Sequence, residues 1–328
     1  MSENLAKFGV PFMFRRVTAA VLLPVLIISG CASLPKNVTH QLPPNIPASH
    51  QIAGVPFIQQ DDFQCGPATL AMALGYHEAP ASVDELTSMV FSPDRKGTLQ
   101  PFMIGAVRRL GLIGIEIDSL SALLSELAAN NPVIILQNNG LSLFPRWHYA
   151  LATGYDINQQ TITLHSGSIP DYQLELHRFY QTWQRSKFWG LVITPPNKVP
   201  VTAPPGQLFL ASAAIDQLGF HDQAAMTYFS ILEKFPDHLD TRLALANYHY
   251  GKRDLTTARQ ALEKAVSTHP NSAVAHNNLA QVLLEQNVLA KAQHHAQIAV
   301  DLGGPFIDTA NQTLLQINQM IKRNKTDE

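Results

Sequence analysis

The stretch that decides the fold reads Gln59-Gln60-Asp61-Asp62-Phe63-Gln64-Cys65-Gly66-Pro67-Ala68. Cys65 follows a polar loop and stands directly before Gly66 and Pro67, which open an apolar run typical of a helix. Proline is favoured in a first helical turn because its missing N–H would have no partner there. The pattern therefore predicts Cys65 at a helix N-terminus, where free N–H groups and the helix dipole favour a thiolate. A small buried hydrophobic side chain is the alternative role for a free cysteine.

The composition fits a globular protein of about two domains, at roughly 150 residues for each. The chain has 328 residues, of which 46% are hydrophobic and 15% are charged. Its formal net charge is -2, and no large basic block is present. We therefore expect no nucleic-acid partner.

Residues 1–30 have the pattern of an export signal. Three basic residues precede an uncharged run over residues 17–28, which is too short to span a bilayer as a mature helix. The run ends at Ile28-Ser29-Gly30-Cys31, which resembles the bacterial lipobox. The resemblance implies cleavage before Cys31 and a diacylglycerol on its sulfur, and a plain secretory signal or an uncleaved anchor is the alternative.

Ala32 follows the lipobox cysteine, and the resemblance to proteobacterial lipoproteins then implies anchoring by lipid to the outer membrane, facing the periplasm. Residues 31–51 carry several prolines and are predicted to be a spacer. If Cys31 is lipidated, Cys65 has no partner for a disulfide within the chain. A free thiol in an oxidising compartment would be explained by catalysis.

Residues 52–196 are predicted to form an α+β domain. Ser82, followed by Glu85, is the expected N-cap of the second helix. Helices that are followed by an antiparallel set of strands are typical of α+β folds. The apolar periodicity predicts helices from Cys65 to about Gly75, over 82–89, 99–110 and 119–129, and strands over 52–58, 132–136, 147–155, 161–164 and 189–193.

His148 lies on one of these strands and shares the domain with Cys65. Alternation places His148, Ala150 and Ala152 on one face of the strand, so the imidazole would have small neighbours. A histidine on a strand is more often structural than catalytic. Its position after the apolar strand over 132–136 nevertheless makes it the candidate base.

Gln59, Cys65-Gly66 before a helix, and a later His148 on a strand together resemble the papain-like cysteine peptidases. More narrowly, residues 52–195 resemble the bacteriocin-processing domain that cleaves after double-glycine leaders. The resemblance implies Cys65 as nucleophile, His148 as general base, and Gln59 as an oxyanion donor beside the backbone N–H of Cys65. It implies a peptide or protein substrate, and no cofactor is expected.

The third catalytic residue departs from this family. An aspartate normally follows the histidine on the next strand, but the equivalent stretch here reads Thr163-Leu164-His165-Ser166-Gly167. His165 is the expected orienting residue, because related papain-fold cell-wall peptidases use a histidine there and one imidazole can fix the tautomer of another. The Ser166 hydroxyl and a backbone carbonyl are the alternatives.

Residues 197–205 are predicted to link this domain to a repeat region over 206–322. Ala224, Ala258 and Ala292 are spaced by 34 residues, which resembles the tetratricopeptide repeat. Units of about 205–238, 239–272 and 273–306 with a capping helix would form an all-α solenoid whose groove binds peptides or a protein partner. A plain bundle of helical hairpins is the alternative. His294 and His295 are adjacent on a helix and poorly placed to share a metal ion, so no metal is expected.

Two functions compete at this level. The first is an envelope-anchored cysteine peptidase that hydrolyses peptide or amide bonds, with the repeats docking substrate or partner. The second is an inactive peptidase-like domain in a periplasmic scaffold lipoprotein. The presence of Gln59, Cys65 and His148 together favours the enzyme.

Overall fold

The computed structural model describes residues 42–61, 63–141 and 143–326, all within one compact unit, Leu34–Glu328. The predicted signal peptide over 1–30 and the lipobox Cys31 lie outside the described residues, as does most of the spacer over 31–51. None of the helices that the structure describes has both the length and the apolar character needed to cross a bilayer.

After the short strand β1 (Ser49–Gln51), the first half of the described chain continues with helices. Ser82 accepts a hydrogen bond from the backbone N–H of Glu85, which confirms the predicted N-cap of the second helix. A short hairpin then precedes the next helix. These elements are α2 (Cys65–Tyr76), α3 (Val83–Val90), β2 (Phe91–Ser92), the 3-10 turn η1 (Pro93–Arg95), β3 (Gly97–Thr98) and α4 (Gln100–Arg109).

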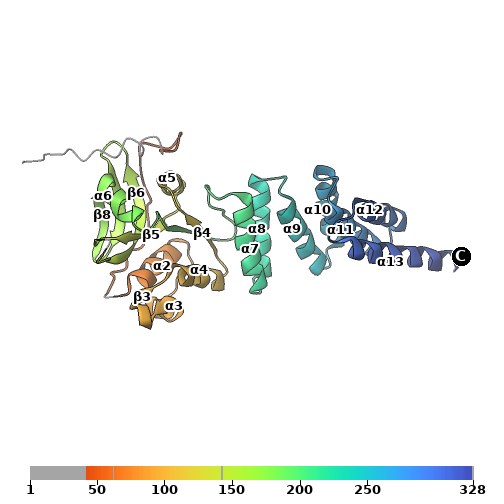
Figure 1. Ribbon diagram of the computed structural model, residues 1–328, viewed down its shortest axis with the longest axis horizontal. Helices are drawn as coiled ribbons and strands as arrows, with labels where there is room; N and C mark the ends of the chain where they lie inside the picture. Colours follow the sequence, from red (N-terminus) through yellow and green to blue (C-terminus); the bar gives the residue numbers. More distant parts are fainter. Residues whose placement is uncertain (1–41, 62, 142, 327–328) are drawn as a thin grey trace, which may run out of the picture. The chain divides into compact units, whose positions relative to one another are not determined.

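A seven-stranded antiparallel sheet follows, in the order β4-β9-β5-β6-β7-β8, with β1 paired to the second half of β6 (Figure 1). The predicted strand over residues 52–58 was wrong. Gly54 and Pro56 interrupt that stretch, and the chain pairs with β6 just before it, over Ser49–Gln51. The strands are β1 (Ser49–Gln51), β4 (Ile113–Ile117), β5 (Val133–Asn138), β6 (Trp147–Asp156), β7 (Thr161–Ser166), β8 (Ile169–Glu175) and β9 (Gly190–Thr194).

Two buried cores lie on opposite faces of this sheet. One is formed with α2, α3 and α4, and nine of the twelve residues of α2 are buried in or beside it. The other is formed with α5 (Leu120–Ala128) and α6 (Leu176–Gln184). Because α2 is enclosed on nearly every side, the residue at its N-terminus is held in a fixed place. The α+β class predicted from the sequence is confirmed.

Helical hairpins make up the second half of the described chain (Figure 1). Ala224, Ala258 and Ala292 lie at equivalent places in the second helix of each hairpin and are all 0% exposed. Their small side chains let the paired helices approach closely, as the 34-residue spacing predicted. The helices are α7 (Pro205–Gln217), α8 (His221–Lys234), α9 (Leu239–Gly251), α10 (Leu255–Thr268), α11 (Ala273–Glu285), α12 (Leu289–Leu302) and α13 (Ile307–Thr326).

The first hairpin shares a core with the sheet. Ile113 and Ile115 of β4 pack with Leu208 and Ile215 of α7. The residues between the two halves are also held, since the buried Glu126 carboxylate accepts from the Thr202 backbone N–H at 2.7 Å and from its hydroxyl at 2.6 Å. The predicted linker over 197–205 is therefore fixed against the α+β domain and is not a free tether.

Candidate active site

Cys65 is the first residue of α2, and its thiol is largely enclosed. Burial raises the pKa of the Cys65 thiol above its ordinary value of 9.0. Hydrogen bonds from the backbone N–H groups of Tyr149, Gly66 and Cys65 itself lower that pKa, but by less. The N–H groups at the helix start thus favour the thiolate, as expected, but burial opposes them more strongly.

The position after Cys65 has no room for a side chain, and glycine occupies it. A Cβ at this position would lie 2.5 Å from Thr98 Oγ1 and 2.6 Å from Thr98 Cβ, closer than real side chains approach. The absence of a side chain therefore lets β3 lie directly against the start of α2. Thr98 in turn lines the cleft that Cys65 opens into.

His148, near the start of β6, lines the same cleft as Cys65. The cleft has a volume of about 1110 Å³. The Nε2 atom of His148 lies 2.9 Å from the Ser166 hydroxyl, and burial lowers the pKa of the imidazole below its ordinary value of 6.5. In the free protein the thiol and the imidazole are thus both held toward their neutral forms.

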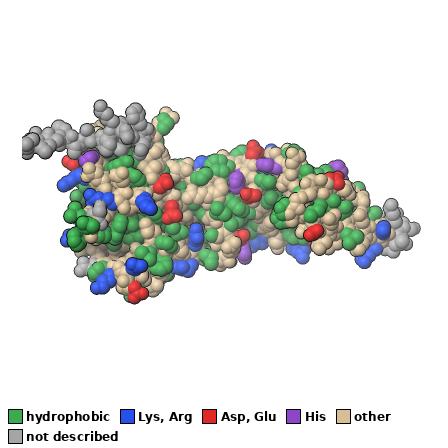
Figure 2. All heavy atoms as spheres, viewed as in Figure 1, with side chains coloured by type: hydrophobic (Ala, Val, Ile, Leu, Met, Phe, Trp, Pro, Cys, Tyr) green, Lys and Arg blue, Asp and Glu red, His purple; other side chains and the backbone are tan. Residues whose placement is uncertain are grey.

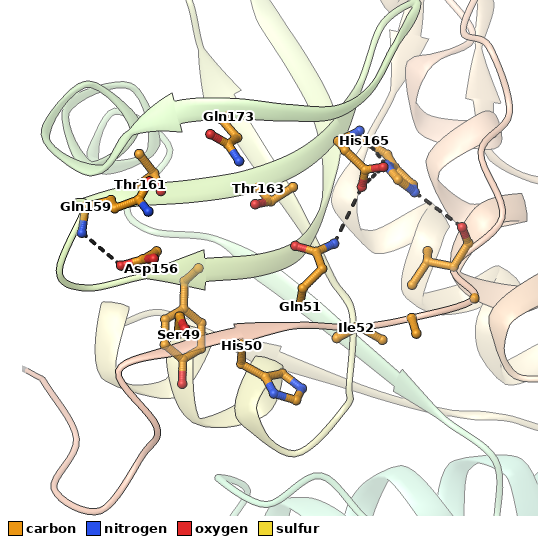
Figure 3. Close-up of a pocket in the computed structure, with 15 residues that line it drawn as sticks. Ser49, His50, Gln51, Ile52, Asp156, Gln159, Thr161, Thr163, His165 and Gln173 are labelled. Atoms are coloured by element: carbon orange, nitrogen blue, oxygen red, sulfur yellow. Dashed lines mark hydrogen bonds and ion pairs between the residues drawn. The ribbon is translucent and has the colours of Figure 1, made fainter.

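His165 lies elsewhere, and its expected role is corrected. Its Nδ1 accepts from the backbone N–H of Asp171 at 3.2 Å, and its Nε2 donates to the carbonyl of Val55 at 3.4 Å. Figure 3 shows the ring among the residues of a separate polar pocket, directed toward these two partners. The register of the β7–β8 pair shifts between Leu164 and Ser166, at His165. Ser166, one of the alternatives at the sequence level, is the residue that contacts His148.

Gln60, not Gln59, lines the cleft. Gln59 is exposed and is not among the lining residues, so the structure does not bring this predicted residue to the cleft of Cys65. The two glutamines are neighbours, and only the path of the loop shows which one turns inward. No signal in the sequence separates them.

The Gln60 side chain connects the three segments that carry the site. Its Nε2 donates to Thr69 Oγ1 at 3.0 Å and, over a longer 3.4 Å, to the carbonyl of Tyr149. Its Oε1 accepts from the backbone N–H of Gly167 at 3.0 Å. The backbone N–H of Gln60 donates to the Gly167 carbonyl at 3.1 Å. Thr69 lies one turn after Cys65, Tyr149 follows His148, and Gly167 follows Ser166. The contacts of Gln60 therefore fix the relative positions of Cys65, His148 and Ser166.

Comparison with known families shows what this domain resembles. Residues 52–190 match the Peptidase_C39 like family. The match covers the C39-like domain, which contains Gln60, Cys65, His148 and Ser166, and does not extend into the helical hairpins. A search of curated proteins found no significant match.

Three solved structures resemble parts of the chain. One, from Bacillus anthracis, is described as a C39-like peptidase and is 17% identical, with 44% of this chain and 97% of that chain covered and a TM-score of 0.39. The peptidase domain of Streptococcus ComA, a bifunctional ABC transporter, is 20% identical. The match covers 43% of this chain and 98% of that chain, with a TM-score of 0.37. MamA from Desulfovibrio magneticus is 22% identical. The match covers 45% of this chain and 76% of that chain, with a TM-score of 0.34.

His, Cys, Asp and Glu side chains are the usual protein ligands of metal ions. Within residues 42–61, 63–141 and 143–326, no group of three or more His, Cys, Asp or Glu side chains is arranged to hold a metal ion. His295 lies 3.0 Å from His276, Nδ1 to Nδ1, so it bonds another histidine.

Proposed function

We propose that this protein is a cysteine peptidase that hydrolyses a peptide or amide bond in the cleft of the C39-like domain. The observation that carries the proposal is the shared cleft of Cys65 and His148, with the Ser166 hydroxyl 2.9 Å from His148 Nε2. A nucleophile, a base and a group that orients the base are the three parts that acyl transfer needs. The match of residues 52–190 to a peptidase-like family supports the same reaction class.

The orientation of His148 assigns its two nitrogens. With Nε2–H donating to Ser166 Oγ, the lone pair on Nδ1 takes the proton of the Cys65 thiol. The sulfur then attacks the substrate carbonyl, and the imidazolium returns its proton to the leaving amine as the carbon–nitrogen bond breaks. Water, deprotonated by the same imidazole, releases the acyl group from sulfur.

Two N–H donors serve the oxyanion of the tetrahedral intermediate. One is the backbone N–H of Cys65, at the N-terminus of α2. The other is the Gln60 amide, whose second N–H is held only by the long 3.4 Å contact with the Tyr149 carbonyl. Because this contact is long and weak, the same N–H can also be shared with an oxyanion while the other Gln60 hydrogen bonds stay in place.

A thiol-directed probe on the full chain tests the proposal. The chain has two cysteines, so a Cys31→Ser background leaves Cys65 as its one thiol. A peptidyl vinyl sulfone should label this variant at least tenfold faster than a simple alkyl vinyl sulfone, and His148→Ala should remove the difference. Equal rates for the two reagents, with and without His148, would refute a catalytic site.

The lipobox and the repeats extend this proposal. Cys31 carries the lipid, which places the peptidase on the outer membrane facing the periplasm, and the groove of the helical hairpins docks a substrate or partner protein. The support is the sequence pattern alone. Cys31→Ser should move the protein from the membrane fraction to the soluble periplasmic fraction and abolish incorporation of labelled palmitate, whereas a Cys65→Ser control should change neither.

Two observations favour the second candidate, an inactive scaffold. The partner of His148 is a hydroxyl rather than a carboxylate, and burial raises the pKa of Cys65. Both features weaken the nucleophile. If the peptidyl and alkyl vinyl sulfones label Cys65 at equal rates while the full chain still captures a periplasmic protein, the protein acts as a scaffold.

A further inference from the structure

The charged residues that line the cleft are mostly basic. Among the residues that the structure describes, four cationic side chains line it against one carboxylate, Asp61. The chain as a whole has the opposite balance, with 25 acidic and 23 basic residues, so the enrichment is local. The four cations are Arg95, Lys96, Arg185 and Lys187.

These cations come from two segments that are far apart in sequence. Arg95 ends η1 and Lys96 follows it, whereas Arg185 and Lys187 follow α6. Lys96 and Lys187 both have left-handed backbone, with φ of 48° and 59°, which is uncommon for residues other than glycine. Unfavourable backbone of this kind concentrates at functional sites.

The cations are available to a ligand. The ion pairs found among the described residues involve none of the four. Arg185 is fixed by Nη1, which donates to the carbonyls of Asn138 at 3.0 Å and Gly140 at 2.6 Å. Its hydrogen bonds in the described structure thus use one nitrogen, and Nε and Nη2 can reach a carboxylate.

The same cleft has exposed apolar side chains. Phe63, Leu99 and Trp147 line it and are 59%, 38% and 51% exposed. Figure 2 shows hydrophobic and Lys or Arg side chains side by side on the face of the molecule that it draws. Large exposed apolar side chains beside unpaired charges are typical of a binding surface.

We propose that the cleft selects an acidic peptide segment, with carboxylates on both sides of a large apolar residue. The two basic segments bind the carboxylates, and Phe63, Leu99 and Trp147 contact the apolar side chain. The inference rests on the proposed function, since it names the substrate class of that site. A cleft lined by one sign of charge also raises the local concentration of an oppositely charged ligand.

Binding to the full-length Cys65→Ala protein tests the inference without requiring cleavage. Peptides of one length carry Leu at the centre and two flanking residues on each side that are all Glu, all Gln or all Lys, with a neutral fluorophore. Anisotropy should give a dissociation constant for the Glu peptide about tenfold below that of the Gln peptide at low salt, because several exposed ion pairs act together. The Lys peptide should bind weakest, and added salt should weaken only the Glu peptide.

Charge reversal provides the matched controls. Lys96→Glu with Lys187→Glu should abolish the preference for the Glu peptide, whereas Lys264→Glu with Lys291→Glu, on exposed positions of the hairpins, should keep it. If the cleft variant fails to fold, the salt dependence of peptide binding by the Cys65→Ala protein provides a second measurement. No preference for the Glu peptide, or equally tight binding of an oligonucleotide of the same charge, overturns the inference.

Cleavage of the same peptides by the wild-type chain separates the two proposals. If the Glu peptide binds selectively but is not cleaved, the proposed peptidase activity is refuted and the proposed selection of acidic peptides stands. Cleavage at equal kcat/KM for all three peptides refutes the specificity and leaves the peptidase.

Discussion

His148 Nε2 lies 2.9 Å from the Ser166 hydroxyl. A hydrogen bond of this kind contributes about 1 kcal/mol, so Ser166→Ala should lower kcat about fivefold while KM changes little. Ser166→Asp should instead raise the pKa of His148 and move the acidic limb of the pH–rate profile upward, because a carboxylate stabilises the imidazolium. His165→Gln is the control and should leave kcat near wild type. A larger loss in the His165 variant than in Ser166→Ala would contradict this assignment.

Gln60 and Gln59 form a matched pair for the oxyanion donor. Gln60→Ala should lower kcat by about 100- to 1000-fold, the usual cost of removing one such donor, and Gln59→Ala should stay close to wild type. Gln60→Glu, which keeps the size and loses the N–H donors, should resemble Gln60→Ala. Steady-state kinetics on one peptide measures all three variants, and equal activity of Gln59→Ala and Gln60→Ala would refute the role of Gln60.

The pH dependence of Cys65 alkylation follows from its burial. Because the pKa of the thiol is raised above 9.0 and that of His148 is lowered below 6.5, both groups are neutral between these limits. The rate of reaction with iodoacetamide in the Cys31→Ser background should therefore keep rising with pH to above 9. A plateau that begins below pH 7 would show a preformed thiolate–imidazolium pair and would contradict the expectation.

Gly66 and Gly206 test the close approach of β3 to α2. Gly66→Ala places a Cβ 2.5 Å from Thr98 Oγ1, and such overpacking costs about 1–3 kcal/mol of unfolding free energy. Gly206→Ala, where a Cβ meets nothing within 4 Å, should be neutral or stabilising. Urea unfolding followed by tryptophan fluorescence measures both. Adding Thr98→Gly to Gly66→Ala should restore part of the loss, and no recovery would mean that the strain lies elsewhere.

His77 predicts how stability depends on pH. Burial lowers its pKa to about 4, the Lys198 charge adds to the effect, and a hydrogen bond to the Ile193 backbone opposes it. A depressed folded-state pKa gives stability that is present above the ordinary value of 6.5 and is lost as pH falls toward 4. His77→Phe should therefore flatten the decline of the thermal midpoint between pH 7 and pH 4.5, and Lys198→Met should flatten it partly. An unchanged slope in both variants would exclude His77 as the cause.

The elements with strong periodicity could be predicted from the sequence. The alanines spaced by 34 residues predicted buried helix crossings, and the cap at Ser82 predicted a helix start. β8 was missed because its residues are mostly exposed and Pro170 interrupts any apolar alternation. Beyond Pro170, only Tyr172 and Leu174 alternate on one face, which is too short a pattern to predict a strand.

The site was predicted in part. Cys65 and His148 line one cleft, as the sequence-level hypothesis required. Gln59 and His165 do not lie at this cleft, whereas Gln60 lines it and Ser166 contacts His148. These placements depend on a loop path and on the register shift between Leu164 and Ser166. A single-residue shift reverses which side chains face the site, and local composition does not reveal it.

The packing of β4 on α7 sets the smallest fragment of this chain that can be prepared by itself. A protein ended at residue 196 would expose Ile113 and Ile115 to water and leave the Glu126 carboxylate without its Thr202 donors. An excised catalytic fragment has to retain the first hairpin, through about Phe235, whose ring belongs to the same core. A chimera in which another module replaces the repeats would likewise need this hairpin as its adaptor.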